Sequence, residues 1–184
     1  MWSPIIAFLL PSLILMYISR SSLRSPRSHG FYRFLAWEFI PALFLLNAKF
    51  WFRNLLAWYQ LIAWTLLFAA LPSLVFGIGA LKSHGKPSTD REGDPSLLGF
   101  EKTTQLVTSG IYKYIRHPLY SSLLLLTWGI FFKLPSITGG VLAAAATLFL
   151  LATAKADEDE CIQFFGTEYQ NYMKHTKRFI PFLL

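Results

Sequence analysis

Long apolar stretches separated by short polar segments make up most of this 184-residue sequence. A transmembrane helix needs about 20 mostly apolar residues, because each residue adds about 1.5 Å towards the roughly 30 Å of hydrocarbon. Glu38 and Pro41 interrupt the second stretch, whereas the other four contain no acidic residue. The pattern predicts an all-α, polytopic transmembrane helix bundle of about five spans, of which the second is the weakest. The five stretches are residues 1–19, 34–48, 54–81, 117–132 and 137–154.

Basic residues gather on one side of the predicted membrane. If the chain starts outside, 14 of the 17 Lys and Arg residues fall in segments 20–33, 82–116 and 155–184. Cytoplasmic loops are rich in Lys and Arg, so we expect an external or lumenal amino terminus and a cytosolic carboxyl terminus, in a bacterial inner membrane or the endoplasmic reticulum. Because the positive charge follows the first apolar stretch, we expect a retained helix and no signal peptide. The three exceptions are Lys49, Arg53 and Lys133.

The amino-acid composition narrows the class of protein further. Hydrophobic residues make up 54% of the chain and charged residues 15%, whereas soluble domains carry about 25% charged residues. The apolar content also excludes disorder. The net charge of +7 follows from the cytosolic segments, so we expect membrane lipids and no nucleic acid as partners. The single Cys161 excludes an internal disulfide and a cysteine-based zinc cluster, and we expect no metal site.

Two polar segments are predicted to meet at one end of a helical hairpin. Pro118 suits the first turn of the fourth helix, which places Arg116 and His117 at an entrance that favours an anion. The short turn at residues 133–136 makes the fourth and fifth helices antiparallel. Arg116 and His117 should therefore lie near Asp157 and Glu158, at the end of the fifth helix. Opposite charges at one place suit a zwitterionic ligand that also carries a cationic centre.

Each of these features also has a purely structural interpretation. Arg116 at a membrane boundary can be a snorkelling anchor, and residues 157–160 can be a solvated helix end. Four acids at the carboxyl end of a helix are unfavourable because of the helix dipole, however, so we expect them to have a basic partner. Tyr112 and Tyr120 are also typical of an interfacial aromatic belt.

The ordered combination of these motifs resembles the isoprenylcysteine carboxyl methyltransferase family, which is related to the phospholipid methyltransferases. The likeness covers residues 106–184, less than half of the chain. We therefore expect residues 1–100 to form amino-terminal transmembrane helices, a loop and the substrate-facing part. Residues 101–184 would form the methyltransferase core, with a helical hairpin and a carboxyl-terminal cytosolic cap. The motifs are Gly110-x-Tyr112-x-x-x-Arg116-His117-Pro118-x-Tyr120, Asp157-Glu158, Phe165-Gly166-x-Glu168-Tyr169-x-x-Tyr172 and Arg178-x-Ile180-Pro181.

The resemblance implies S-adenosylmethionine as the methyl donor. The family has paired glutamates where this chain has Asp157 and Glu158, so Glu158 is the preferred candidate of the two. Lys113 stands where the family commonly has Arg, which keeps the charge but loses bidentate geometry. The expected donor-binding residues are Gly110, Tyr112, Arg116, His117, Pro118, Tyr120 and Glu158.

The acceptor is expected to be lipophilic, either a prenylcysteine-like carboxylate or a lipid amine. A carboxylate needs no base, whereas an amine does, and His117, or secondarily His29, is available for that role. Arg178 is the candidate that orients an anionic acceptor. Glu38, the only acid inside a predicted span, either contacts the substrate or forms a hydrogen bond to a neighbouring helix.

Two other functions fit the same sequence. One is an NADPH-dependent membrane reductase of the steroid-reductase type, which resembles this family near the carboxyl terminus. The other is a noncatalytic membrane scaffold or carrier, which would bind neither nucleotide. The identity of the acceptor and the oligomeric state stay open.

Overall fold

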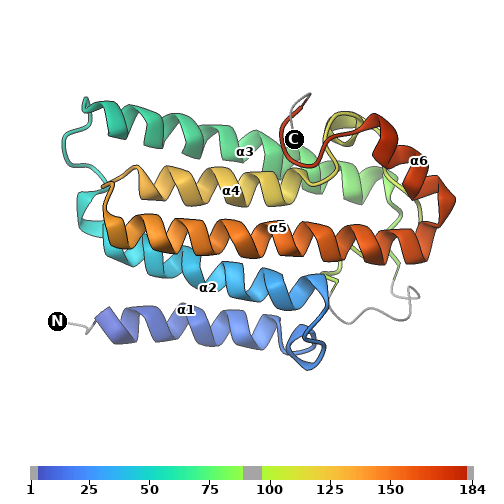
Figure 1. The fold of residues 1–184 in the computed structure, drawn as a ribbon, viewed down its shortest axis with the longest axis horizontal. Coiled ribbons are helices and arrows are strands. Elements are labelled where there is room, and N and C mark those ends of the chain that lie inside the picture. The colour runs from blue at the N-terminus through green and yellow to red at the C-terminus, as the bar shows by residue number, and fades with distance from the viewer. Residues whose placement is uncertain (1–3, 89–96, 182–184) are drawn as a thin grey trace.

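The computed structural model describes residues 4–88 and 97–181, and within these ranges the chain is helical with no β-strand. Figure 1 shows five long helices lying side by side, with the short α6 at one end. The predicted all-α class is confirmed. The long helices are α1 (Pro4–Ile18), α2 (His29–Asn47), α3 (Trp58–His84), α4 (Pro118–Phe131) and α5 (Ile137–Phe165). The short ones are α6 (Thr167–His175) and the 3-10 turns η1 (Ser22–Arg24), η2 (Ala48–Phe50) and η3 (Gly110–Lys113).

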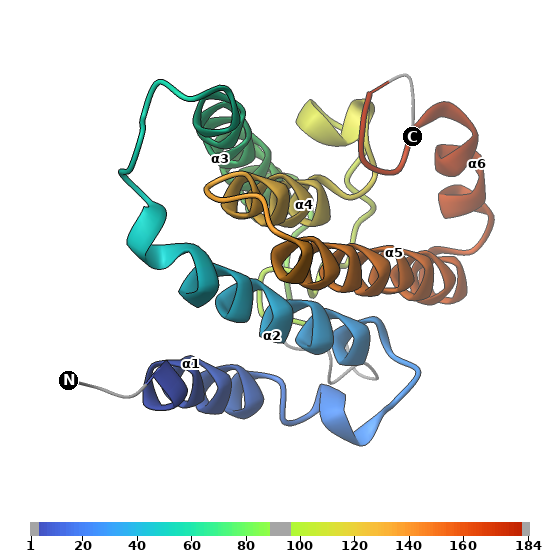
Figure 2. The same ribbon diagram turned by 60° about the vertical axis from the view of Figure 1, so that its left-hand side comes forward.

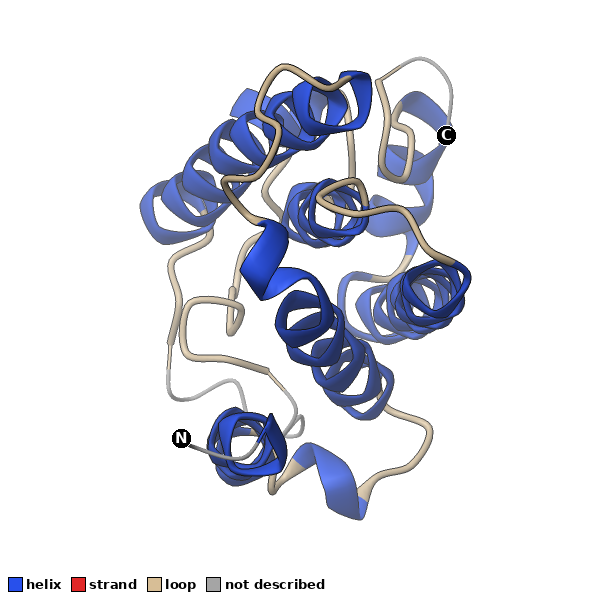
Figure 3. Ribbon diagram, turned by 90° about the vertical axis from the view of Figure 1, so that its left-hand side faces the viewer, coloured by secondary structure: helices blue, strands red, loops and turns tan. Residues whose placement is uncertain are grey.

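Helix α4 lies in the middle of the bundle. It packs against α3, α5 and α2, and α2 packs along α5. Figure 2 shows α1 at the edge beside α2, and the view along the bundle in Figure 3 shows the same layering. The amino-terminal helices and the carboxyl-terminal hairpin therefore share one core. Ile40, Leu43, Ile130, Ala143 and Ala146 form its main cluster.

Two helices are long and apolar enough to cross a bilayer, namely α3 and α5. The apolar residues 6–18 and helix α4 are shorter. Large apolar side chains point outwards on α3, where Phe68 and Val75 are each 62% exposed. Such exposure suits lipid and disfavours water. The crossing by all five helices, and the orientation, remain predictions.

Two helices depart from the expected pattern. Helix α2 runs unbroken through Glu38 and Pro41. A proline inside a helix removes one backbone hydrogen bond, and packing against neighbouring helices can compensate for this loss. Helix α5 continues to Phe165. The four acids at residues 157–160 therefore lie inside the helix, whereas the sequence had indicated that they lie at its end. The dipole effect is confined to the last turn, so it does not oppose these acids.

A buried polar cluster fixes the end of the bundle opposite α6. Lys133 is fully buried, and its Nζ donates to Gln60 Oε1 at 3.1 Å and lies 3.3 Å from the centre of the Trp64 ring. Gln60 Nε2 donates to the Lys133 carbonyl at 2.9 Å, and Asn47 Nδ2 donates to the Ile130 carbonyl at 2.8 Å. These bonds give carbonyl groups at the carboxyl end of α4 and in the turn after it side-chain donors. Lys133 is thus part of the core, which explains why it departs from the charge pattern of the loops.

Candidate functional site

The carboxyl-terminal segment pairs with the chain just before α4. The Arg116 N–H donates to the Lys177 carbonyl at 2.7 Å, and the His117 N–H donates to the Arg178 carbonyl at 3.0 Å. Ser121 Oγ adds a bond of 2.9 Å to the Phe179 carbonyl. The sequence had suggested that N–H groups at the helix start would be available to an anion. The two that precede α4 are instead taken by the carboxyl-terminal segment.

The predicted meeting of basic and acidic residues is confirmed. Arg116 Nε donates to Glu158 Oε1 at 2.9 Å. His117 lies between both acids, with Nδ1 3.4 Å from Asp157 Oδ2 and Nε2 3.3 Å from Glu158 Oε1. Arg116 and His117 are therefore the basic partners of Asp157 and Glu158.

Glu158 is the centre of this charge cluster. Its side chain is 3% exposed and also accepts bonds from Arg178, at 3.0 Å and 3.1 Å from Nε and at 2.6 Å from Nη2. A carboxylate with two guanidinium partners and an imidazole has its oxygen lone pairs largely used. Glu158 thus joins the start of α4 to the carboxyl-terminal segment.

Arg116 extends the same network to α6. Its Nη1 donates to the carbonyl groups of Met173, at 3.2 Å, and of Thr176. Together with Nε on Glu158, this single side chain connects α4, α5 and the end of α6. Charge-assisted bonds of this kind are stronger than neutral ones, so the end of the bundle is held rigidly.

The surroundings of His117 favour its protonated form. The side chain is buried and its ring lies 5.3 Å from that of Tyr120, nearly parallel to it. Burial opposes the charged form, but hydrogen bonds to Asp157 and Glu158 outweigh burial and raise the pKa of His117 above its ordinary 6.5. Both ring nitrogens face carboxylates, which only accept hydrogen bonds. The protonated imidazole cannot accept a further proton, so the base role expected for His117 requires its neutral form.

A cavity of about 100 Å³ adjoins the charge cluster. Of the expected site residues, Tyr112, Arg116, His117, Pro118 and Tyr120 line it. Asp157 also lines it, although the sequence had favoured Glu158. The remaining lining residues are Leu81, Leu97, Glu101, Thr103, Leu106, Val107, Leu119, Glu160, Cys161, Phe165, Tyr169 and Tyr172.

Four other expected residues lie outside the cavity wall. Glu158 and Arg178 support it from behind, and the Arg178 side chain is 40% exposed. Gly110 has a φ of +62°, which only glycine adopts readily, and it starts η3, which carries Tyr112. Glu38 accepts a hydrogen bond from Ser12 of α1, as in the structural interpretation of this residue.

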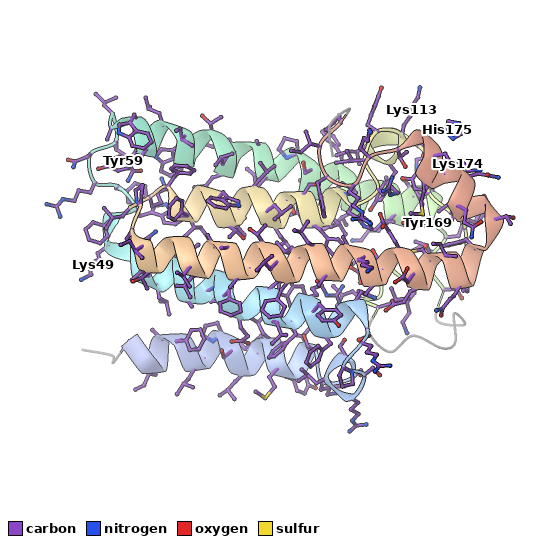
Figure 4. The ribbon with its side chains drawn as sticks, viewed as in Figure 1. Lys49, Tyr59, Lys113, Tyr169, Lys174 and His175 are labelled. Atoms are coloured by element: carbon purple, nitrogen blue, oxygen red, sulfur yellow. The ribbon has the colours of Figure 1, made fainter. Side chains whose placement is uncertain are left out.

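Helix α6 closes the site. Tyr169 and Tyr172 bring aromatic rings to the cavity, and the Tyr172 hydroxyl donates to the Tyr112 carbonyl at 2.7 Å. Figure 4 shows Tyr169 at the end of the bundle opposite Lys49. That this carboxyl-terminal segment forms a cytosolic cap stays a prediction.

Sequence reasoning did not place Glu101 and Glu160 in the site. Glu101 pairs with Arg33, and Glu160 pairs with His29, both from α2. The partners lie 68 and 131 residues apart, so no local motif joins them. The available signal was spacing, because His29 and Arg33 are four residues apart on one helix face.

One group of possible metal ligands also lies here. Ligand atoms of His29, Asp157 and Glu160 lie within 4.8 Å of one another. Hydrogen bonds already join His29 to Glu160 through both its backbone N–H and its Nδ1. These bonds account for the grouping without an ion.

A helical bundle with two helices that are long and apolar enough to cross a bilayer, and with a charged, tyrosine-lined cavity at one end, is typical of an integral membrane protein. Residues 95–175 match the phospholipid methyltransferase family. These matched residues contain most of the cavity wall.

Curated relatives agree with the family. A methanethiol S-methyltransferase of Pseudomonas deceptionensis is 32% identical over 75 residues, 40% of this chain and 27% of that protein. Methanethiol S-methyltransferase 1 of Bradyrhizobium diazoefficiens is 32% identical over 88 residues, 46% of this chain and 30% of that protein. The protein-S-isoprenylcysteine O-methyltransferase of Mus musculus is 35% identical over 82 residues, 44% of this chain and 29% of that protein.

The chain thus matches less than a third of the length of each of these relatives. No solved structure matches it significantly.

Proposed function

We propose that this protein is an integral membrane methyltransferase that uses S-adenosylmethionine and methylates a lipophilic acceptor. The meeting of Arg116 and His117 with Asp157 and Glu158 beside a cavity, within the family segment, carries this proposal. The chain would cross the membrane about five times, with the cavity at the cytosolic end. Residues 1–100 would supply the substrate-facing helices.

The chemistry of the cavity residues suits such a donor. When bound, the donor supplies a methyl group on a cationic sulfonium, together with an ammonium, a carboxylate and an adenosine. Carboxylates such as Asp157 pair with ammonium or ribose hydroxyl groups, and faces of Tyr112 and Tyr120 attract a cation. The closed volume of about 100 Å³ is below the roughly 300 Å³ at the low end of small-molecule sites. A nucleoside-sized ligand must therefore extend through the mouth or displace lining side chains.

The motif residues take separate roles in this proposal. Asp157, Tyr112, Pro118 and Tyr120 line the donor site, and Arg116 contributes its remaining face there. Further residues support the wall: Gly110 shapes the turn, while His117 and Glu158 hold Arg116 and Asp157 in place.

The acceptor would be one that needs no imidazole base. His117 lies between two carboxylates that favour its protonated form, and His29 is fully enclosed at 1% exposure. A prenylcysteine-like carboxylate is already ionised, so it fits better than a lipid amine. Arg178, which is 40% exposed beside the site, would orient such an anion. Leu81 and Leu119 give the cavity an apolar side for a lipophilic group.

Donor binding to the purified full-length protein in detergent tests this function. We expect S-adenosylmethionine to bind in isothermal titration calorimetry and NADPH not to bind. Asp157→Asn should weaken donor binding about 10-fold, the effect of losing roughly 1.4 kcal/mol from one charge-assisted bond. The matched control is Asp159→Asn, because Asp159 is exposed on the same helix. Binding of NADPH would favour the reductase, and binding of neither nucleotide would favour the scaffold.

A further inference from the structure

Helix α2 carries two buried basic residues that point at the cavity wall. His29 and Arg33 are 1% and 4% exposed and stand one helical turn apart. Both precede residues 95–175, so they lie outside the family segment. Because α2 packs along α5, His29 reaches Glu160 of that helix, whereas Arg33 reaches Glu101 in the segment before η3.

Arg33 holds Glu101. Its Nη1 donates to both carboxylate oxygens, at 2.9 Å and 2.7 Å, and the Glu101 side chain is 11% exposed. The Leu98 N–H donates to the same carboxylate at 2.8 Å. Glu101 lines the cavity, so this ion pair fixes where its negative charge lies.

His29 holds Glu160 in a corresponding way. The His29 backbone N–H donates to Glu160 Oε1 at 2.8 Å, and its Nδ1 pairs with Oε2. A carboxylate at the first turn of α2 is also favoured by the helix dipole. Glu160 is 24% exposed and lines the same cavity.

We propose that Glu101 and Glu160 form a carboxylate wall that recognises the positive charge of the donor sulfonium, with Arg33 and His29 as positioning residues. The proposal rests on the proposed function. Transfer of the methyl group leaves a neutral thioether, S-adenosylhomocysteine, so the charge at sulfur is the main difference between donor and product. In a partly desolvated cavity a carboxylate distinguishes these two strongly. The wall would thus favour the donor over its product and help the product leave.

The ratio of two dissociation constants tests this proposal. We expect Glu101→Gln and Glu160→Gln each to weaken binding of S-adenosylmethionine about 10-fold and of S-adenosylhomocysteine less than about twofold. Glutamine removes the charge and keeps one acceptor oxygen for Arg33 or His29, while its amide NH2 group replaces the other acceptor oxygen. The matched control is Glu168→Gln, because Glu168 is exposed on α6 and does not line this cavity.

Paired variants of α2 test the positioning role. Arg33→Lys should keep the donor preference, because a single nitrogen makes both bonds to Glu101. His29→Asn should keep it as well, since an amide N–H can replace Nδ1. In contrast, Arg33→Met and His29→Leu should lower the donor preference several-fold without abolishing product binding.

The possible failures are distinguishable. If the wild-type protein binds neither ligand, the proposed function is wrong. If it binds both and the two Glu→Gln variants weaken them equally, the function stands and the carboxylate wall is refuted. Glu160, as the more exposed acid, provides this test even if Glu101→Gln fails to fold.

Discussion

At the scale of single residues, neighbouring acids in one motif have different surroundings. Asp157 faces the cavity, whereas Glu158 is 3% exposed and engaged by Arg116, Arg178 and His117. One position along a helix rotates a side chain by about 100°, so adjacent residues face different neighbours. Removal of the buried Glu158 would leave Arg116 and Arg178 without their carboxylate partner, and such losses are costly.

The raised pKa of His117 makes stability depend on pH. Its pKa is higher in the folded protein than the ordinary 6.5, so the folded state binds the proton more tightly than the unfolded chain. The resulting stabilisation is complete below pH 6.5 and is lost as pH rises through the raised pKa. We therefore expect the Tm difference between wild type and His117→Asn, measured by thermal unfolding in detergent, to shrink from pH 6 upwards.

His175→Asn is the control for this measurement. His175 is exposed on α6, so its Tm difference from wild type should stay nearly constant over the same range. If the Tm difference between wild type and His117→Asn widened as pH rises, the imidazole would be neutral in the folded protein.

At the scale of elements, glycine-dependent turns orient the pieces that close the cavity. Gly166 links α5 to α6 with φ +60° and ψ −133°, a conformation essentially restricted to glycine. The direction of α6 decides where Tyr169 and Tyr172 meet the cavity. Backbone conformation at one residue thus controls an aromatic wall that comes from a separate helix.

Gly166→Ala should lower the free energy of unfolding by about 1–3 kcal/mol, because alanine is strained in that conformation. A Cβ at this position meets nothing within 4 Å, so a steric clash does not contribute. Donor affinity should also fall, since α6 carries part of the wall. Both effects can be measured by thermal unfolding and calorimetry.

Gly79→Ala is the matched control, because a Cβ there also meets nothing within 4 Å and the residue lies inside α3. In a helix, alanine is favoured over glycine by roughly 0.5–1 kcal/mol. Equal destabilisation by the two changes would mean that backbone strain is not the cause at Gly166.

At the scale of the whole molecule, the two ends of the bundle differ in chemistry. Figure 4 shows Lys113 and Lys174 at the end that carries the site, and Lys49 and Tyr59 at the opposite end. The predicted orientation puts the site end in the cytosol. Membrane-impermeant thiol reagents can test it, because Cys161 is the only natural cysteine.

In a Cys161→Ala background, we expect Lys174→Cys to react only in inside-out vesicles and Lys49→Cys only in intact cells. Both lysines are exposed, so accessibility from the water depends on the side of the membrane. If both positions reacted from the same side, the predicted odd number of membrane crossings between residues 49 and 174 would be contradicted.

The sequence determined the helical class, most helix positions and the meeting of Arg116 with Glu158. These features follow from local rules. The apolar stretches predict the helices, and a four-residue turn makes the two helices that it joins antiparallel, which brings Arg116 to Glu158. The expected bounds of α4 were close to the observed ones. Helix α5 extends past the acids, because polar residues continue a helix once partners from other elements neutralise them.

Only the tertiary structure decided which acids face the cavity. Glu101 and Glu160 owe their places to Arg33 and His29, and pairs separated by 68 and 131 residues leave no periodic trace in the chain. The carboxyl-terminal segment likewise takes N–H groups before α4 that appeared available from the sequence. Local spacing specifies helices and turns because their hydrogen bonds are short-range, whereas the side of a helix that meets a charge depends on how the whole bundle packs.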